Sequence, residues 1–238
     1  MKMQEIIFKL IYLVIFSFII LTLISIASII YTGLEEKYFS LRLCLNNDCI
    51  NRAGIYYSSI INLFISSTQI LAAIATALGI VVAALTFKNT SDTNALSSHI
   101  SHFQVFSSYL SLEIDKRERI KISSINMFDW YNLIFKNSIS GSVVVSNEYI
   151  KTLQDINIEI TTTNDNATKA SQGPFRHHEH QARMKKVFAK LGIEIEHYPK
   201  NDYWLIENEI ITLIDSINQA FCQKPKLATL TEREYYKK

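Results

Sequence analysis

The sequence has few of the motifs by which enzymes hold phosphates, cofactors or metals. Only six glycines occur among its 238 residues, and none belongs to a phosphate-binding loop or a dinucleotide fingerprint. A Gly-x-Ser-x-Gly elbow, a Cys-x-x-Cys pair and a His-Glu-x-x-His helix are also absent from the sequence. An enzyme is therefore not expected, because catalysis would need a constellation assembled from distant residues.

Net charge is small, and two long stretches carry no charge at all. The formal net charge is +2, so electrostatics alone implies no nucleic-acid partner. Residues 10–31 are uncharged, and about 22 residues make about 33 Å of helix, which matches a hydrocarbon core of about 30 Å. A secretory signal peptide is excluded, because the stretch is too long and no small-x-small cleavage site precedes Glu35.

The second uncharged stretch, residues 53–87, is longer than a bilayer requires. We place the membrane span at residues 63–87, with Lys88 at the exit and Tyr56–Tyr57 among the headgroups. The sequence therefore predicts a two-helix membrane hairpin over residues 1–88, with spans at 10–31 and 63–87 and a periplasmic loop at 32–54.

Charge counting alone does not settle the orientation of this hairpin. The flanks carry equal numbers of cations on the two sides, namely Lys2, Lys9 and Lys88 against Lys37, Arg42 and Arg52. Glu35 and Glu36 directly follow the first span, whereas cations precede it, and this asymmetry favours a cytoplasmic N-terminus. The prediction is a multi-pass inner-membrane protein whose N- and C-termini are both cytoplasmic.

Two of the three cysteines lie close together in the loop that this topology exports. Cys44 and Cys49 bracket the segment Leu45-Asn46-Asn47-Asp48. Disulfides persist in the periplasm, so this spacing predicts an intrachain disulfide, with two unrelated thiols as the alternative. Cys222 lies in the other compartment and is expected to be a reduced thiol.

The remaining residues predict an α-rich cytosolic domain over residues 89–224 with at most a small β element, followed by a mobile tail at 225–238. Apolar residues at spacings of three and four predict a helix over residues 94–115, which could extend the second membrane helix or pack back on the domain. A second helix is predicted over residues 124–136, whereas residues 147–160 fit either a helix or a strand.

Further along, the polar stretch 161–173 reads as a surface loop, and Pro174 is expected to open a helix that runs to Leu191. Residues 193–197 alternate like a short strand, with residues 119–122 as a possible partner. Asn201-Asp202 then caps a last helix through Phe221. The fold class is thus a mainly α membrane protein.

A basic stripe borders the apolar face of the predicted helix at 174–191. Such stripes meet phosphate on nucleic acid or anionic lipid, although an ordinary solvated flank is the alternative. The stripe, a candidate partner or phosphate contact, comprises Arg176, Arg183, Lys186 and Lys190.

Histidines cluster at the start of the same helix. His177 and His180 could share a face, as metal ligands do, but no third ligand at a comparable position is evident. We therefore predict no metal site and a solvated start to this helix.

Small side chains follow one stripe along the second membrane span and would let helix backbones approach closely. Gln69 adds an amide roughly 9 Å below the outer surface, where it needs a partner. The stripe fits either packing against the first helix or self-association between copies, and it comprises Thr68, Gln69, Ala72, Ala75, Thr76, Gly79 and Ala83.

The layout resembles the two-transmembrane effector proteins of bacterial retrons, which are anti-phage systems. The helix pair carries the resemblance, together with Cys44-Leu-Asn-Asn-Asp-Cys49, Ser101-His-Phe-Gln-Val-Phe106 and Phe128-Asp-Trp-Tyr-Asn-Leu-Ile-Phe135. It implies a toxin without a cofactor, kept silent by a reverse transcriptase and its RNA–DNA hybrid and released on phage attack. The released protein would damage the inner membrane and cause abortive infection. Because a single hairpin does not breach a lipid bilayer, we expect the active form to be a homo-oligomer. The rival hypothesis is a membrane-anchored sensor or scaffold whose domain binds a ligand or protein.

Overall fold

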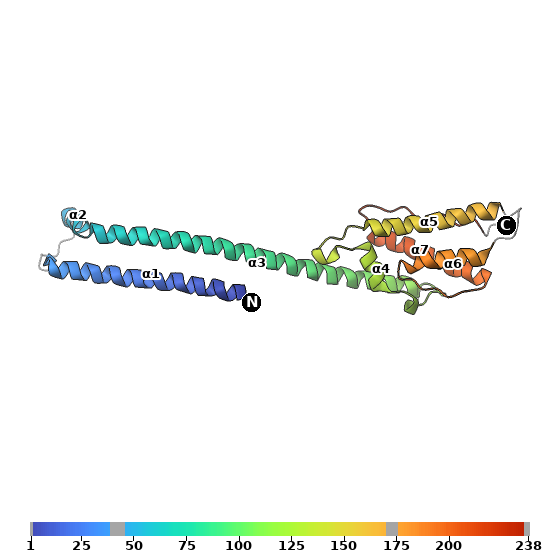
Figure 1. Ribbon diagram of the computed structural model, residues 1–238, viewed down its shortest axis with the longest axis horizontal. Coiled ribbons are helices and arrows are strands. Elements are labelled where there is room, and N and C mark those ends of the chain that lie inside the picture. The colour runs from blue at the N-terminus through green and yellow to red at the C-terminus, as the bar shows by residue number, and fades with distance from the viewer. Residues whose placement is uncertain (1, 39–45, 170–175, 236–238) are drawn as a thin grey trace. The chain divides into compact units, whose positions relative to one another are not determined.

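The computed structural model describes residues 2–38, 46–169 and 176–235, and these are largely helical (Figure 1). The order of elements is α1 (Lys2–Glu35), α2 (Asn47–Tyr56), α3 (Ser58–Asp115), α4 (Met127–Ile134), α5 (Asn147–Thr168), α6 (His177–Ala189) and α7 (Lys200–Phe221), with 3₁₀ turns at Ile122–Ser124 and Ser138–Ser140. The described residues contain no strand, only isolated bridges. The predicted fold class, mainly α with a two-helix hairpin, is confirmed.

The chain divides into two units, Met1–Thr90 and Ser91–Lys238, and the division falls inside α3. Two helices are long and apolar enough to cross a membrane: Glu5–Glu35, within α1, and Ser58–Asp115, which is α3. With 58 residues, α3 is about 87 Å long at 1.5 Å per residue, so much of it extends beyond a hydrocarbon core of about 30 Å. Residues 94–115 therefore continue the second membrane helix.

Several hydroxyl groups in the apolar helices bond a carbonyl of their own helix. Ser17 Oγ, for example, donates to the Val14 carbonyl at 2.8 Å, and Thr68 Oγ1 donates to the Phe64 carbonyl at 2.7 Å. These bonds matter in lipid, where no water can pair with a free polar group.

Residues 47–56, which the sequence placed largely in the loop, form α2, whose N-cap Asn46 accepts a hydrogen bond from the Cys49 amide.

The second unit has a continuous apolar core, to which the C-terminal part of α3 contributes Phe106, Leu110 and Ile114. The Phe106 ring packs edge-on against Tyr131 of α4, with centroids 5.4 Å apart, and against Phe221 of α7 at 5.3 Å. His102 of α3 also contacts α4: its Nδ1 lies 3.0 Å from Tyr131 Oη. Burial lowers the pKa of this histidine. The second membrane helix thus ends as a core element of the domain.

Helix α5 is longer than the sequence predicted. It runs through residues 161–168, which were expected to be a surface loop, because polar residues there have partners inside the domain. Thr163 is buried with its hydroxyl 2.9 Å from His180 Nδ1, and Asn164 Nδ2 donates to the Glu232 carbonyl at 3.0 Å. The strand alternative for residues 147–160 is wrong, since these residues are helical.

Helix α6 begins at His177, and Pro174 lies outside the described residues.

The predicted pairing of residues 193–197 with residues 119–122 is also wrong. Ile193 instead bridges Ile125, and the two extended segments separate beyond that bridge. The physical reason is the 3₁₀ turn at Ile122–Ser124, which interrupts the first segment.

The segment after α7, predicted to be a mobile tail, instead packs on the second unit as far as residue 235. Its backbone amides donate to side-chain oxygens of α5 and α7: Leu230 to Asp215 Oδ1 at 3.0 Å, Thr231 to Asn157 Oδ1 at 2.8 Å, and Glu234 to Asn164 Oδ1 at 2.7 Å. Leu230, Arg233 and Tyr235 are buried. The buried residues of this segment follow no regular spacing, and their partners are distant in the sequence, which explains why sequence alone missed this packing.

A buried ionic network fastens this segment to the helices. Glu207 of α7, completely buried, accepts from Arg233 Nη1 at 2.8 Å, and its other carboxyl oxygen lies 2.7 Å from His180 Nε2 of α6. The Arg233 guanidinium also lies over the Trp204 ring, 3.5 Å from its centroid, and bonds Asn208 Oδ1 at 2.6 Å. A buried carboxylate needs such partners, because desolvating an unpaired charge is costly.

Replacing Arg233 with alanine should lower the free energy of unfolding by about 3–5 kcal/mol, because Glu207 would stay buried with one charged partner fewer. The midpoint of urea unfolding of the full-length protein in detergent, followed by tryptophan fluorescence, measures this loss. Both tryptophans, Trp130 and Trp204, lie in the second unit, so the signal reports that unit alone.

The matched control is Lys136→Ala, which removes a surface ion pair with Glu148 whose two side chains are each 61% exposed. Exposed pairs contribute up to about 1 kcal/mol, so this variant should unfold close to wild type. Equal midpoints for the two variants would show that the buried network does not stabilise the fold.

Candidate functional site

Within the first unit, helix α3 has two different faces. The half-buried residues of α3 mark the side that packs on α1: Phe64, Ser67, Thr68, Leu71, Leu78, Val82 and Leu85. Near one end of this contact, Val82 and Leu85 line a crevice of about 220 Å³ together with Ile7, Phe8 and Ile11 of α1. Packing within the hairpin is therefore carried mainly by large apolar side chains.

The predicted small-residue stripe lies on another side of α3. Only Thr68 is half-buried, whereas the other members are exposed: Gln69, Ala72, Ala75, Thr76, Gly79 and Ala83. A Cβ added at Gly79 would meet no atom within 4 Å, so no part of its own unit fills that space. Gln69 has no hydrogen-bond partner among the described residues. Intrachain packing thus leaves most of this stripe uncovered.

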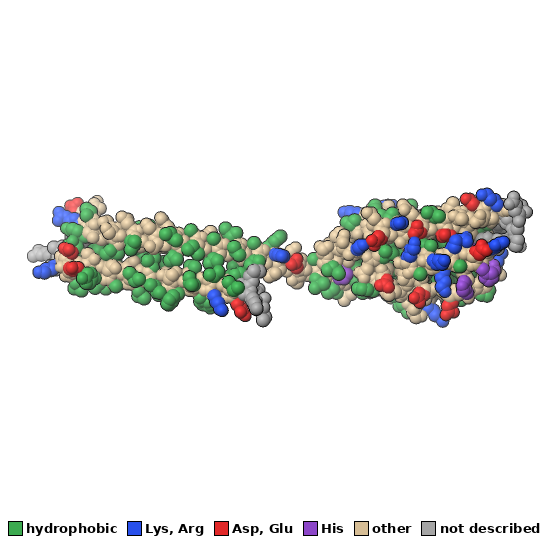
Figure 2. All heavy atoms as spheres, viewed as in Figure 1, with side chains coloured by type: hydrophobic (Ala, Val, Ile, Leu, Met, Phe, Trp, Pro, Cys, Tyr) green, Lys and Arg blue, Asp and Glu red, His purple; other side chains and the backbone are tan. Residues whose placement is uncertain are grey.

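Most of the basic stripe on α6 is already paired within the second unit. Arg183 Nε lies 2.8 Å from Glu159 Oε2, and Lys190 Nζ lies 2.8 Å from Asp155 Oδ2, both acids on α5. Arg176 pairs with Glu179 of its own helix at 3.0 Å. Lys186 is exposed and has no ion pair within the described part of the chain. On the face drawn in Figure 2, basic and acidic side chains intermingle over the second unit. The partner or phosphate contact stays a prediction.

The histidine cluster at the start of α6 is split between surface and core. His178 is exposed, and its ring lies 3.8 Å from that of His177. His180 is buried between Thr163 and Glu207, as described above. Within the described ranges, no three His, Cys, Asp or Glu side chains are placed to hold a metal ion. The His180 ring therefore has a structural role in the buried network.

The cysteines differ in chemical state. Cys49 is disulfide-bonded, whereas Cys44 lies outside the described residues, so the predicted Cys44–Cys49 pairing is left as a prediction. Cys222 is a free, buried thiol. Burial raises the pKa of the Cys222 thiol to about 12, which keeps it protonated and unreactive at neutral pH.

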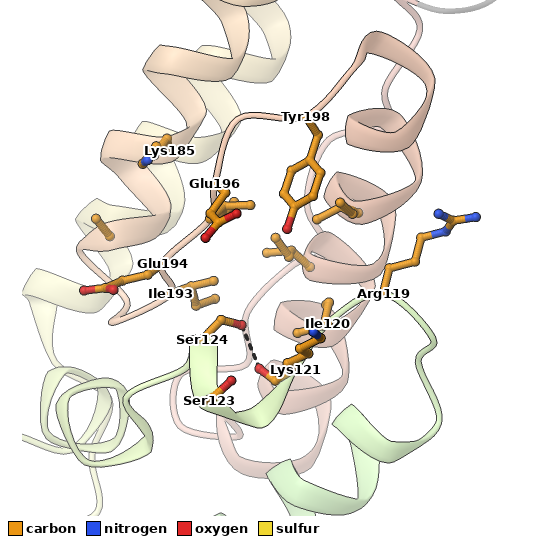
Figure 3. A pocket seen from close by; sticks show the side chains of 14 residues that line it. Arg119, Ile120, Lys121, Ser123, Ser124, Lys185, Ile193, Glu194, Glu196 and Tyr198 are labelled. Carbon is orange, nitrogen blue, oxygen red and sulfur yellow. Dashed lines mark hydrogen bonds between the residues drawn. The ribbon is translucent and has the colours of Figure 1, made fainter.

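A charged groove of about 640 Å³, which was not predicted from the sequence, opens on the second unit (Figure 3). It lies between residues 119–121, with the 3₁₀ turn that follows them, and the extended residues 193–198, and Ile206 and Ile210 of α7 also line it. Lys121 and Lys185 line it together with Glu194 and Glu196. The alternation of apolar and charged residues in both segments is the sequence signal that could have indicated it.

These features are those of a membrane protein with two long apolar helices and a helical domain. The comparisons with known proteins give the family. The family described as Retron Ec48 antiviral membrane protein matches residues 54–225, and the chain belongs to this family. It is 27% identical over 213 residues to the Retron Ec48 transmembrane protein of Escherichia coli, covering 89% of this chain and 90% of that protein.

No solved structure matches the chain. The family membership confirms the resemblance to retron membrane proteins and makes the chain a membrane protein of retron-associated antiviral defence. The matched region begins inside α2 and ends just after α7, so it includes the second membrane helix and nearly all of the helical domain.

We expect membrane-impermeant maleimide to label Cys44 and Cys49 in intact spheroplasts only after reduction, because a disulfide leaves no thiol to react. Cys222 should stay unlabelled in the folded protein under both conditions and react after denaturation, since it is buried and protonated. Mass spectrometry of the labelled peptides gives the readout. Labelling of Cys44 and Cys49 without reduction would contradict the disulfide, and a Cys44→Ser variant with a newly reactive Cys49 serves as control.

Proposed function

We propose that this chain is the membrane-damaging effector of its retron system, held inactive by partner components and disrupting the inner membrane once released. The observation that carries the proposal is the uncovered small-residue stripe on α3, together with the open space at Gly79. The family name supports a membrane protein in antiviral defence.

Membrane damage by a two-helix hairpin requires several copies. A single hairpin has satisfied backbone groups and an apolar surface, so it sits in a bilayer without breaching it. Close approach of α3 helices along the stripe would bring Gln69 amides together, and interhelical contacts in lipid contribute roughly 0.6–2 kcal/mol each. The α1-facing side of α3 would keep most of its packing in such an assembly, because it shares only Thr68 with the stripe.

The partners follow from the same proposal. The resting state is held by the retron reverse transcriptase and its RNA–DNA hybrid, while the active state is a homo-oligomer in the lipid bilayer. The protein lies in the bacterial inner membrane with both termini in the cytoplasm. In this orientation the second unit faces the partners, and the loop that carries Cys44 and Cys49 faces the periplasm.

Expression of the protein without its retron partners separates the effector from a membrane-anchored sensor or scaffold. An effector should depolarise the membrane and admit dye when expressed alone. A tether should be harmless at the same level of membrane insertion, and that outcome would overturn the proposal.

Gly79→Leu should reduce dye uptake and depolarisation in cells that express the protein alone. Leucine would hold neighbouring α3 helices apart, and losing about 1–2 kcal/mol of association lowers the assembled population about five- to thirtyfold. The substitution should leave the hairpin intact, because the added Cβ has no atom within 4 Å other than the neighbouring backbone of its own helix. Membrane fractionation measures insertion in the same cells.

Ala77→Leu is the matched control. It adds a similar volume at an exposed position two residues away, roughly 200° around the helix from Gly79. This variant should insert and permeabilise like wild type. Should Gly79→Leu insert normally and permeabilise as strongly as Ala77→Leu, the stripe has no part in self-association.

Lys186→Glu should weaken co-purification with the retron partners if the basic stripe contacts their phosphates. Lys186 is the sharpest choice because its charge, unlike that of Arg183 or Lys190, is not compensated by a described acid. Losing one phosphate contact should also make the plot of the logarithm of the association constant against the logarithm of salt concentration less steep, by about one unit of slope.

Lys151→Glu, an exposed cation on α5 without an ion pair among the described residues, makes the same charge change off the stripe. Its complex should keep the wild-type salt dependence. If both variants co-purify alike at every salt concentration, the stripe is a solvated flank.

A further inference from the structure

A turn between α4 and α5 holds apolar side chains at the surface of the second unit. In this turn, residues 138–144, Ile139 is 65% exposed, Val143 46% and Val144 58%. The sequence around it is free of charge, since residues 137–147 include no Asp, Glu, Lys or Arg. Neighbouring exposed apolar side chains with a polar surround are typical of surfaces that contact a membrane or another protein.

The 138–144 turn packs against the part of α3 that belongs to the second unit (Figure 1). A Cβ added at Gly141 would lie 3.4 Å from Ala95 Cβ, so the turn and the helix are in van der Waals contact at this glycine. Gly141 has a φ of +85°, which glycine adopts without strain. Next to this contact, His99 Nδ1 lies 2.9 Å from Ser138 Oγ. The position of the turn is therefore fixed relative to α3.

The contact lies a short distance along α3 from the membrane. Ala95 is seven residues after Lys88, the predicted exit from the bilayer, and this length of helix spans about 10 Å. The headgroup region extends roughly 5–8 Å beyond the hydrocarbon core on each side. This distance depends only on α3, which is helical throughout this stretch. The side chains of the 138–144 turn can therefore reach the lipid headgroups.

The surface of α3 beside the turn is suited to the same environment. Leu96 and Ile100, each directly after a residue that contacts the turn, are about half exposed. Residues 93–112 contain no Asp, Glu, Lys or Arg. On the face drawn in Figure 2, the end of the second unit at which α3 enters it carries mainly apolar and uncharged side chains. The apolar surface of the turn thus continues onto the helix that leads to the membrane.

Two exposed lysines lie beside the turn. The Val145 amide, directly after the turn, donates to the Lys224 carbonyl at 3.5 Å, and Lys226 belongs to the same tight bend of the chain as Lys224. Both lysines are exposed and have no ion pair within the described residues. Glu148, the acid that follows the turn, is already paired with Lys136. Apolar side chains flanked by unpaired cations are the composition that binds an anionic lipid surface.

We propose that the 138–144 turn rests on the bilayer in which α3 is inserted, with its exposed apolar side chains at the level of the headgroups and with Lys224 and Lys226 against anionic lipid. The bilayer is the favoured partner because α3 itself brings the turn to within reach of it. Such a contact would hold the second unit at the membrane surface. The proposal depends on the location of the protein in a membrane and not on whether it damages that membrane.

The test uses the full-length protein in vesicles made of equal parts of phosphatidylcholine and phosphatidylglycerol, with a nitroxide quencher on the lipid acyl chain close to the headgroup. Ser140→Cys carries an NBD fluorophore, and this exposed position leaves the apolar side chains of the turn in place. The control probe is Thr162→Cys, an exposed position of α5 about 22 Å along that helix from Asn147. Wild-type protein, labelled in parallel, gives the contribution of the native cysteines. Quenching at position 140 should exceed quenching at position 162 at least about twofold.

In the Ser140→Cys background, Ile139→Ser should lower the ratio of docked to undocked turns roughly tenfold, because it removes an apolar anchor. The quenched fraction of the fluorescence reports this ratio. The matched control is Ile158→Ser on α5, where the isoleucine is 60% exposed, and its quenching should equal that of the parent protein.

Lys224→Gln/Lys226→Gln should lower the same ratio up to about thirtyfold in the mixed vesicles and leave it unchanged in vesicles of phosphatidylcholine alone. The matched control is Lys121→Gln/Lys200→Gln, which removes two charges from exposed positions elsewhere on the second unit. This control should be quenched like the parent protein in both kinds of vesicle.

Equal quenching at positions 140 and 162 would overturn the proposal. So would a blue shift of the probe at position 140 without quenching by the nitroxide lipid, because that result would show burial against protein, such as a second copy of the chain. Quenching that neither Ile139→Ser nor the double lysine variant reduces would show that the turn lies near the bilayer without binding it. These readouts are independent of toxicity, so a harmless protein with a docked turn would refute the effector proposal alone.

Discussion

The need to satisfy every backbone polar group inside a bilayer governs this protein more than any other interaction. An uncharged stretch in lipid has no water to pair with its amides and carbonyls, so it must be helical. Some hydroxyls of α1 and α3, such as those of Ser17, Thr68 and Thr76, follow the same rule by bonding carbonyls of their own helix. Helix α3 then continues beyond the apolar stretch to Asp115, and its last turns supply Phe106 and Leu110 to the core of the second unit. One part of this helix is therefore suited to lipid, and its C-terminal part is suited to the apolar core of a domain.

Charged side chains are paired differently in the core and on the surface. In the core, Glu207 forms an ion pair with Arg233 and a hydrogen bond with His180, because an unpaired buried carboxylate would be costly. On the surface, α5 and α6 exchange ion pairs at Arg183 and Lys190, and these pairs are expected to contribute little to stability. They do reduce the net positive charge that α6 presents to a partner. The charged side chains that can contact a partner molecule are thus those without an ion pair within the described residues, such as Lys186, Glu194 and Glu196.

Sequence patterns predicted most of the helices because an apolar face at helical spacing is a local signal. The boundaries failed where contacts with distant residues decided them. Residues 161–168 look like a polar loop, yet Thr163 finds His180 and Asn164 finds the backbone of residue 232, so α5 continues. The tail was misjudged for the same reason, since the partners of Leu230 and Thr231 lie on α7 and α5. The alternation at residues 193–197 correctly indicated a half-buried extended segment, but it could not say whether a pairing strand lies in the same chain.

By itself, the sequence determined that the chain has two membrane-length apolar helices, a mainly helical domain and no recognisable catalytic motif. These properties follow from composition and period, which each segment carries alone. Tertiary structure decided which face of α3 packs on α1 and which stays open, because large and small residues compete for the same contact. It also decided that His180 belongs to a buried ionic network and that two extended segments enclose a groove. Such features depend on which residues meet across the fold, and spacing along the chain does not encode that.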